Sequence, residues 1–336
     1  MSAASPAVSV LMPTLNEGPT VAAAVESVLE QSFADLEVLV VDGLSEDSCA
    51  ETVRELAVRQ PQVRLLENPG RLIPHALNIG LAHARGRYVA RVDAHATISR
   101  TYLERAVAIL EAEPGVAAVG GRRVGVARTR TGRAIAAALS SPFGVGDSIN
   151  HYATEAQDTD HASFGVFRAD AVRAVGGWDE ALAVNEDVDL DLRLQEQGHR
   201  IRFDPEMLIH WRIRETLRDF GRQYRRYGRG KAAMVRKNGP AAVRPRHLAA
   251  PGLVLMLGAS ALAAATGRRR VATVLGLPYP AALAVAVPRT IRSAGGGLDA
   301  GRLAGAFATM HLAWGVGFLE GITTRAQPTG ASVRRP

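Results

Sequence analysis

Short apolar segments alternate with helical segments over the first 121 residues, and this alternation restricts the chain to few folds. Helical periodicity spans 20–31, 45–59, 74–85 and 101–113, with Ser45 the expected N-cap of the second helix. Strand–helix–strand connections of this kind build a mainly parallel sheet with helices on both faces, so the expected fold class is α/β. The predicted strands are Val8–Pro13, Glu37–Gly43, Val63–Leu66, Tyr88–Val92 and Val116–Gly121.

The following ninety residues continue this domain with weaker signals. Residues 129–160 are irregular, and we expect them to cover the sheet edge or shape an acceptor pocket. A strand is predicted at 164–168 and a short helix at 169–175. The segment 185–194 predicts a helix whose acidic first turn favours the helix dipole. Two closing strands are predicted at 201–203 and 207–211.

Asp93 and His95 stand at the point where the fourth strand ends. Open α/β sheets bind ligands at the carboxyl ends of their strands, so both side chains can turn toward one metal ion there. The alternative is that Asp93 caps the next helix and His95 is simply exposed. A dinucleotide site is excluded, because the turn 13–18 (Pro-Thr-Leu-Asn-Glu-Gly) lacks the Gly-x-Gly-x-x-Gly pattern that admits a pyrophosphate.

The net charge of +7 is concentrated in one segment. Residues 212–246 hold twelve Lys or Arg against Glu215 and Asp219, a local balance of +10. Such a block suits nucleic acid, anionic lipid or a phosphorylated substrate. The single cysteine, Cys49, excludes an internal disulfide and a cysteine-based zinc cluster.

Three uncharged apolar segments follow, at 248–266, 271–288 and 303–319. Their lengths lie near the lower limit for crossing a bilayer, and Pro278 and Pro280 interrupt the second. We expect up to three membrane-associated helices, with a buried helical subdomain as the alternative. The basic block then becomes a surface for anionic lipid headgroups, and nucleic acid is not an expected partner. The basic run 268–270 conflicts with the positive-inside tendency in a three-span arrangement, which leaves the topology open.

The expected organisation follows from these segments. Residues 1–211 form a cytoplasmic catalytic domain, since Met1–Ala7 has no features of a signal peptide. Residues 212–247 form a basic juxtamembrane segment, 248–322 the membrane-associated helices and 323–336 a disordered tail. The predicted location is the inner (cytoplasmic) membrane, with the catalytic domain facing the cytoplasm.

Six motifs between residues 8 and 230 occur in the order typical of family 2 inverting glycosyltransferases, which the chain resembles. The motifs are 10–17 (VLMPTLNE), 40–43 (VVDG), 76–80 (ALNIG), 93–95 (DAH), 176–180 (GGWDE) and 186–190 (EDVDL). The resemblance implies a GT-A fold, a nucleotide-sugar donor and a divalent metal. The Asp-Ala-His variant and the apolar C-terminal segments look most like the glucosyltransferases of succinoglycan-type exopolysaccharide assembly.

The resemblance assigns a role to individual residues of the donor site. Asp93 and His95 match the metal-binding positions, where the family more often has a second Asp. An imidazole is a softer ligand than a carboxylate, which makes Mn²⁺ as suitable as Mg²⁺. The remaining predicted donor-binding residues are Pro13, Asn16, Glu17, Asp42 and Asn78, with Asp42 placed to accept hydrogen bonds from uracil or ribose.

Asp187 matches the general base of the family, with Glu186 beside it. Two adjacent carboxylates tend to raise one pKa, which suits a base; the alternative is an acidic helix start stabilised by the dipole. Trp178 is expected either to stack on an acceptor sugar or to lie in the core. His210 either reaches the metal or diphosphate or is structural. The run Gln223, Arg226 and Tyr227 resembles the Gln-x-x-Arg-Trp motif of polysaccharide synthases, with Tyr replacing Trp, and implies acceptor and diphosphate contacts.

The expected function is transfer of a single sugar, glucose in the first instance, from a UDP-sugar to a lipid-linked saccharide. Three short apolar segments do not make a polymer channel, which argues against a processive synthase. An alternative acceptor is polyprenyl phosphate itself. An alternative of another class is a non-catalytic membrane scaffold that retains a nucleotide-sugar site.

Overall fold

The computed structural model describes residues 5–239 and 243–323, which form two compact units. The first unit contains residues 5–127 and 147–213. Of the described residues, the second contains 128–146, 214–239 and 243–323. Residues 128–146, which the sequence placed with the catalytic domain, therefore belong to the second unit. The tail predicted at 323–336 lies, apart from Thr323, outside the described residues.

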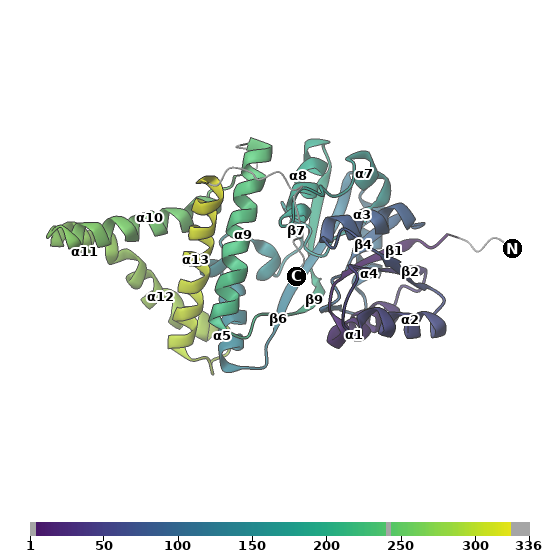
Figure 1. Ribbon diagram of the computed structural model, residues 1–336, viewed down its shortest axis with the longest axis horizontal. Helices are drawn as coiled ribbons and strands as arrows, with labels where there is room; N and C mark the ends of the chain where they lie inside the picture. Colours follow the sequence, from purple (N-terminus) through teal and green to yellow (C-terminus); the bar gives the residue numbers. More distant parts are fainter. Residues whose placement is uncertain (1–4, 240–242, 324–336) are drawn as a thin grey trace. The chain divides into compact units, whose positions relative to one another are not determined.

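One nine-stranded sheet runs through the first unit in the described part of the chain (Figure 1). Its order is β3-β2-β1-β4-β8-β6-β9-β5, and β7 pairs with β9. Strands β1 to β4 are mutually parallel, as is the β6–β9 pair, while β8, β5 and β7 run antiparallel to their neighbours. The predicted α/β class is confirmed, but the sheet is mixed. The strands are β1 (Val8–Thr14), β2 (Leu36–Asp42), β3 (Val63–Glu67), β4 (Tyr88–Arg91), β5 (Ala96–Ile98), β6 (Val116–Val126), β7 (Gln157–Asp158), β8 (Val166–Arg168) and β9 (Arg200–Arg212).

Helices cover both faces of this sheet, as the alternation predicts. Leu77 of α3, Val172 of α7 and Leu190 of α8 share one buried cluster with sheet residues such as Leu11 and Val89. Figure 1 shows α1 and α2 on the opposite face. The helices of this unit are α1 (Gly18–Leu29), α2 (Cys49–Arg59), α3 (Ile73–His83), α4 (Tyr102–Ala112), η1 (Ile149–His151), α7 (Ala169–Ala174) and α8 (Glu186–Glu196).

Two predicted boundaries are wrong for identifiable reasons. Helix α2 begins at Cys49, because the hydroxyl of Ser45 donates to Asp42 instead of capping a helix. The two closing strands are one strand, β9, whose register against β6 shifts between the pairs Gly121–Asp204 and Arg122–Leu208. Pro205 lies in this irregular part of β9. Proline has no N–H for a ladder hydrogen bond, and within a strand it is tolerated at such irregularities.

The second unit is helical in its described residues. Helices α9 and α13 pack along each other, and the backbone of each approaches a glycine of the other. A side chain at Gly228 would meet the backbone of Trp314, and one at Gly317 the backbone of Arg225. Most of the basic segment predicted at 212–247 forms helix α9. The helices are α5 (Arg130–Leu139), α6 (Pro142–Val145), α9 (Leu217–Asn238), α10 (Arg246–Ala265), α11 (Arg269–Gly276), α12 (Pro278–Ser293) and α13 (Ala300–Thr323).

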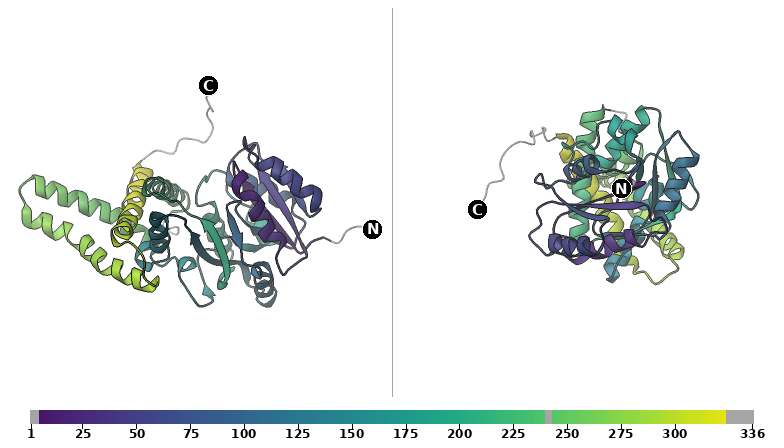
Figure 2. Two further views of the ribbon diagram at one scale, coloured as in Figure 1. Left: turned by 90° about the horizontal axis from the view of Figure 1, so that it is seen from below. Right: turned by 90° about the vertical axis from the view of Figure 1, so that its right-hand side faces the viewer.

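Two stretches in the described residues are long and apolar enough to cross a membrane, Arg246–Ala265 and Arg269–Ser293. Only 11% of each is buried, so neither resembles a core helix. Figure 2 shows α10 leading away from α13 and α11 with α12 returning, as a hairpin. The third predicted segment is different, because α13 buries Leu303, Phe307 and Met310 inside the unit. Of the up to three expected membrane-associated helices, two are therefore candidate spans among the described residues.

Candidate active site

The ends of β1 and β2 form one edge of the candidate site. Thr14 and Asp42 are register partners at these ends, and Pro13 is buried just before. Asp42 accepts hydrogen bonds from the backbone N–H of Ser45 (2.9 Å) and from its hydroxyl. Asn16, whose φ is 57°, accepts from the N–H of Glu46 at 2.8 Å. These bonds lock the two loops together where a donor nucleotide is predicted to lie.

Glu17, Asp93 and His95 approach one another beside this edge. Nδ1 of His95 lies 3.3 Å from Oε1 of Glu17. Burial alone would raise the pKa of Glu17, but His95 and Thr20 lower it. Burial would likewise raise the pKa of Asp93, and the Arg91 guanidinium lowers it. Both carboxylates are therefore ionised at neutral pH.

The described residues hold no ready-made cluster of three or more metal-ligating side chains. Asp93 and His95 nevertheless fit the donor set of a divalent cation that takes its remaining ligands from a substrate. The Asp93 carboxylate keeps lone pairs beyond those that Arg91 uses. The imidazole of His95 is 36% exposed and so is reachable.

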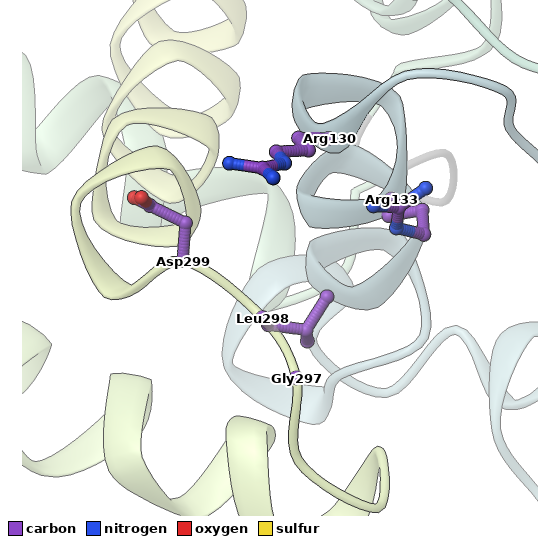
Figure 3. A pocket seen from close by; sticks show the side chains of 5 residues that line it. All are labelled: Arg130, Arg133, Gly297, Leu298 and Asp299. Carbon is purple, nitrogen blue, oxygen red and sulfur yellow. The ribbon is translucent and has the colours of Figure 1, made fainter.

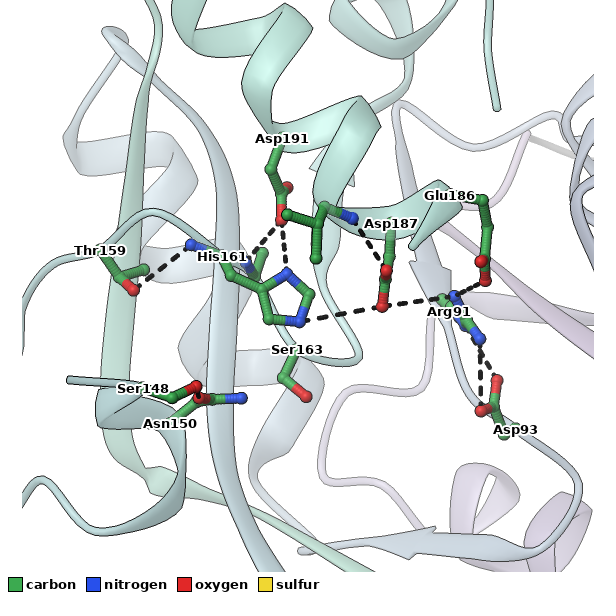
Figure 4. Close-up of polar contacts among 12 residues, drawn as sticks. Arg91, Asp93, Ser148, Asn150, Thr159, His161, Ser163, Glu186, Asp187 and Asp191 are labelled. Carbon is green, nitrogen blue, oxygen red and sulfur yellow. Dashed lines mark hydrogen bonds and ion pairs between the residues drawn. The ribbon is translucent and has the colours of Figure 1, made fainter. Parts of the chain in front are cut away.

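Arg91 connects this edge to the predicted base. Its side chain is only 10% exposed, and Nε donates to Oδ1 of Asp93 at 2.9 Å. Nη1 donates to Oε1 of Glu186 at 2.9 Å and lies 3.8 Å from Oδ2 of Asp187 (Figure 4). Arg91 was not among the predicted site residues. The sequence does contain an indication: Arg91 is a charged residue within an otherwise apolar strand, and a buried charge requires oppositely charged partners.

Glu186 and Asp187 occupy the first turn of α8, and their pKa values are shifted in opposite directions. Burial and the charge of Asp187 raise the pKa of Glu186 to about 7. Burial would also raise the pKa of Asp187, but the charges of His161 and Arg91 lower it below its usual value. The raised pKa expected for the pair thus belongs to Glu186. Asp187 is the ionised member, and its side chain is 32% exposed.

His161, in the loop between β7 and β8, was also missed. Its Nδ1 lies 2.7 Å from Oδ2 of Asp191, and its Nε2 lies 3.8 Å from Oδ2 of Asp187. Asp187 therefore sits between two cationic groups, Arg91 and His161 (Figure 4). The spacing of Asp187 and Asp191, one helical turn apart, was the available signal. Nothing in the sequence identified the histidine that joins them.

Asn78 and Trp178 have structural positions. The Asn78 amide accepts from the N–H of Trp178 (2.9 Å) and donates to its carbonyl oxygen (2.8 Å) and to Glu180 (3.0 Å). It thereby holds the turn that contains Gly177. Trp178 is 2% exposed and packs edge-on against Phe167. Its ring presents no open face to a sugar, so the core alternative applies.

The other predicted acceptor residues are His210, Gln223, Arg226 and Tyr227. His210 is in β9, half-buried, between Thr97 of β5 and Val124 of β6. Gln223 donates to the Tyr227 hydroxyl at 2.9 Å within α9, and the guanidinium of Arg226 lies 5.9 Å from the Tyr227 ring centre. The latter three belong to the second unit, and their acceptor roles stay predictions.

A separate hollow of about 370 Å³ lies in the second unit (Figure 3). It is lined by Arg130 and Arg133 of α5 and by the loop residues Gly297, Leu298 and Asp299. The Asp299 carboxylate is already held by Arg302 at 2.9 Å. None of the predicted site residues lines this hollow, so we do not assign it as the catalytic site.

Comparison with known proteins agrees with this geometry. Residues 9–176 match the profile of Glycosyl transferase family 2. The succinoglycan biosynthesis protein ExoA of Rhizobium meliloti (strain 1021) is 34% identical over 257 residues, 74% of this chain and 73% of that protein. The pre-mycofactocin glycosyltransferase of Mycobacterium tuberculosis (strain CDC 1551 / Oshkosh) is 33% identical over 239 residues, 69% of this chain and 47% of that protein.

Among solved structures, the mannosyltransferase PcManGT from Pyrobaculum calidifontis, in complex with GDP-Man and Mn²⁺, resembles the chain with a TM-score of 0.59. The two are 25% identical, and the match covers 91% of this chain and 87% of that one. The GT-A fold expected from the motifs is thereby confirmed. The chain belongs to glycosyl transferase family 2.

Proposed function

We propose that this glycosyltransferase transfers one sugar, with inversion, from a UDP-sugar to a lipid-linked saccharide in exopolysaccharide or cell-envelope glycan synthesis. The observation that carries the proposal is the Asp187 carboxylate. It is ionised and partly exposed, and Arg91 joins it to Asp93 at the end of β4. The 34% identity to a succinoglycan biosynthesis protein supports a place in exopolysaccharide synthesis. Glucose is the first sugar to test because the family resemblance implies it.

In the proposed reaction, Asp187 accepts the proton of the acceptor hydroxyl as that oxygen bonds to the anomeric carbon and the bond from this carbon to the UDP leaving group breaks. Attack from the side opposite the leaving group inverts the anomeric configuration. A low pKa makes a carboxylate a weak base before substrate arrives. A diphosphate bound near Asp187 would add negative charge, which raises that pKa toward the range that a base needs.

Asp93 and His95 are the residues that would hold a divalent cation. Such an ion supplies neutralisation of the charge that grows on the diphosphate. Asp42, Asn16 and Glu17 are proposed to contact the nucleotide, because their loops are fixed to one another at the edge formed by β1 and β2. Arg91 acts on the chain's own carboxylates, holding Asp93 and Asp187 in one frame.

The test is transfer and donor hydrolysis by the purified full chain in detergent. The panel contains UDP-glucose, UDP-N-acetylglucosamine and GDP-mannose, each with Mn²⁺, Mg²⁺ or EDTA, and with a lipid-linked saccharide or bare polyprenyl phosphate. We expect metal-dependent use of UDP-glucose and a loss of about 100-fold or more in EDTA, since the metal contribution amounts to several kcal/mol. The anomeric configuration of the product checks inversion.

Other outcomes would redirect the proposal. Undiminished turnover in EDTA would remove the metal role of Asp93 and His95. Use of polyprenyl phosphate alone would establish the alternative acceptor. Nucleotide binding without turnover of any donor on any acceptor would favour the non-catalytic scaffold.

We also propose that the α10–α12 hairpin attaches the protein to the cytoplasmic membrane, with the catalytic unit in the cytoplasm. The hairpin is almost unburied and exposes Leu255, Leu262 and Val274, each by more than 60%. The basic residues of α9 precede it in the chain, and anionic headgroups attract such residues.

Changing Leu255, Leu262 and Val274 to Ser together is expected to reduce co-flotation with phosphatidylglycerol vesicles by more than about 100-fold. Each such side chain buried in lipid contributes about 1.5–3 kcal/mol. Val58→Ser, at a residue of α2 that is 85% exposed, is the matched control and should float like wild type. Equal flotation of the triple variant would contradict the membrane role of the hairpin.

A further inference from the structure

A largely shielded histidine, which was not among the predicted site residues, lies beside the proposed base. His161 lies in the loop that joins β7 to β8, and its side chain is only 15% exposed. One side of its ring faces Asp191 and the other faces Asp187 (Figure 4). None of the six sequence motifs includes it.

The contact with Asp191 fixes the ring and requires a proton on Nδ1. Asp191 is fully buried, and its Oδ2 already accepts from the N–H of Ala162 at 2.9 Å. The same oxygen lies 2.7 Å from Nδ1 of His161, while Oδ1 has no hydrogen-bond partner among the described residues. A carboxylate that accepts twice on one oxygen requires the proton on Nδ1. Nε2 is then the atom that meets Asp187.

The loop is anchored so that the ring cannot easily turn away. The N–H of Thr159 donates to the carbonyl of Ile201 in β9 at 2.9 Å. On β6, Gly120 allows the backbone of Ala162 and Ser163 to pass so closely that any side chain there would collide with it. A rigid support of this kind is what a group needs in order to hold another side chain in place.

We infer that His161, held by Asp191, is a positioning residue that keeps the Asp187 carboxylate ionised and oriented for proton transfer from the acceptor. The inference rests on the proposed role of Asp187 as base. At 3.8 Å, Nε2 and Oδ2 form an ion pair rather than a hydrogen bond. Together with Arg91 on the other side, it surrounds Asp187 with two cations and limits its rotation.

The charges around His161 support its protonated form. Burial alone would lower its pKa, but the carboxylates of Asp187 and Asp191 raise it above its usual value. His151 lies close by, and its pKa is lowered by desolvation and by the charge of Arg123, so it stays neutral. The pair His161–Asp187 is surrounded by other titratable and charged groups from every element packed against it. They are Asp191 and Glu186 of α8, Asp160 of the loop, His151 of η1, Arg123 of β6, Arg91 of β4 and Asp93 after its end.

The test uses His161→Asn in the full chain. An Asn side chain places its amide nitrogen at the same distance from Cβ as Nδ1, which retains the bond to Asp191, but it does not reach Asp187. We expect intact folding and nucleotide binding, and a fall in kcat of about 10- to 100-fold. The acidic limb of the pH–kcat profile should move up by about one unit or more, because a cation beside Asp187 is lost. His151→Gln is the matched control and should leave that limb in place.

A second measurement does not depend on catalysis. His161 should titrate above the usual histidine pKa in NMR spectra of the wild type, and its pKa should fall in Asp187→Asn. If wild type transfers no sugar, the proposed function fails, and this titration still decides whether His161 and Asp187 are coupled. The inference is overturned if His161→Asn keeps the wild-type pH profile in an active enzyme, or if Asp187→Asn leaves the titration of His161 unchanged.

Discussion

Replacing Asp187 with Asn is expected to lower kcat about 1000-fold, within the range of 10² to 10⁴ that general-base catalysis contributes. The amide has nearly the shape of the carboxylate but cannot take a proton from the acceptor hydroxyl. The donor KM should change little, because no donor-binding group is removed. Steady-state kinetics with UDP-glucose and a lipid-linked acceptor measure both quantities.

The chain offers a closely matched control in Asp170→Asn. Asp170 is the second residue of α7, as Asp187 is of α8, and each accepts the N–H of the next residue at 2.8 Å. Asp170 is exposed and lies outside the site. If Asp187 served only to stabilise a helix start, both variants would lose similar stability and little activity. Similar activity in the two variants would contradict the assignment of the base.

Glu186→Gln separates the two neighbouring acids. The pKa of Glu186 is raised to about 7, so it is partly protonated at neutral pH, and its carboxyl group is held by Arg91. Removing a charge that is already partly absent should cost at most about tenfold in kcat. A larger loss of kcat in Glu186→Gln than in Asp187→Asn would indicate that Glu186, and not Asp187, is the base.

Periodicity and strand-end residues predicted the parts of this protein that depend on local sequence. Helices α1 to α4 and strands β1 to β4 follow from alternating apolar patterns. Asp93 was predicted as a site residue because it follows the end of a strand, where open α/β sheets bind ligands, whereas Asp42 was predicted from its match to a family motif. Strand β9 could not be predicted as one strand, because Pro205 interrupts its sequence pattern. Only the pairing with β6 shows that the strand continues past this residue.

The site residues that the sequence missed depend on tertiary contacts. Arg91 finds its acidic partners 2, 95 and 96 positions along the chain, and His161 finds Asp191 thirty positions away. Asn78 and Trp178 belong to motifs of the family, and their predicted ligand contacts stay predictions. They hold the core and a turn, and a motif alone does not distinguish that function from ligand contact.

Replacing Arg91 with Met is expected to have the largest effect on stability, a loss of about 3–5 kcal/mol in the free energy of unfolding at pH 7–8. Met is similar in length, so little packing is lost. The cost comes from Asp93, Glu186 and Asp187, which keep their burial and lose their shared cation. Removing one partner of a buried ion pair has a cost of this size because the remaining charge is uncompensated.

The pH dependence identifies the cause of that loss. Burial raises the pKa values of Asp93 and Asp187, and Arg91 helps to lower both below their usual values. A lowered carboxyl pKa contributes stability above the unfolded value and loses it as the pH falls through the folded value. In Arg91→Met these pKa values rise and that contribution is absent at every pH. The difference from wild type should therefore be largest near pH 8 and should shrink as the pH falls toward about 4.

Urea denaturation of both proteins at several pH values measures this difference. Arg87→Met is the matched control: it removes an exposed arginine that pairs with Glu111, and it should stay within about 1 kcal/mol of wild type. A loss that is equal at pH 8 and pH 4 would point to packing instead of charge. Stability like that of wild type would mean that the three carboxylates do not need Arg91. In that case Arg91 would not be the group that links the donor edge to the base.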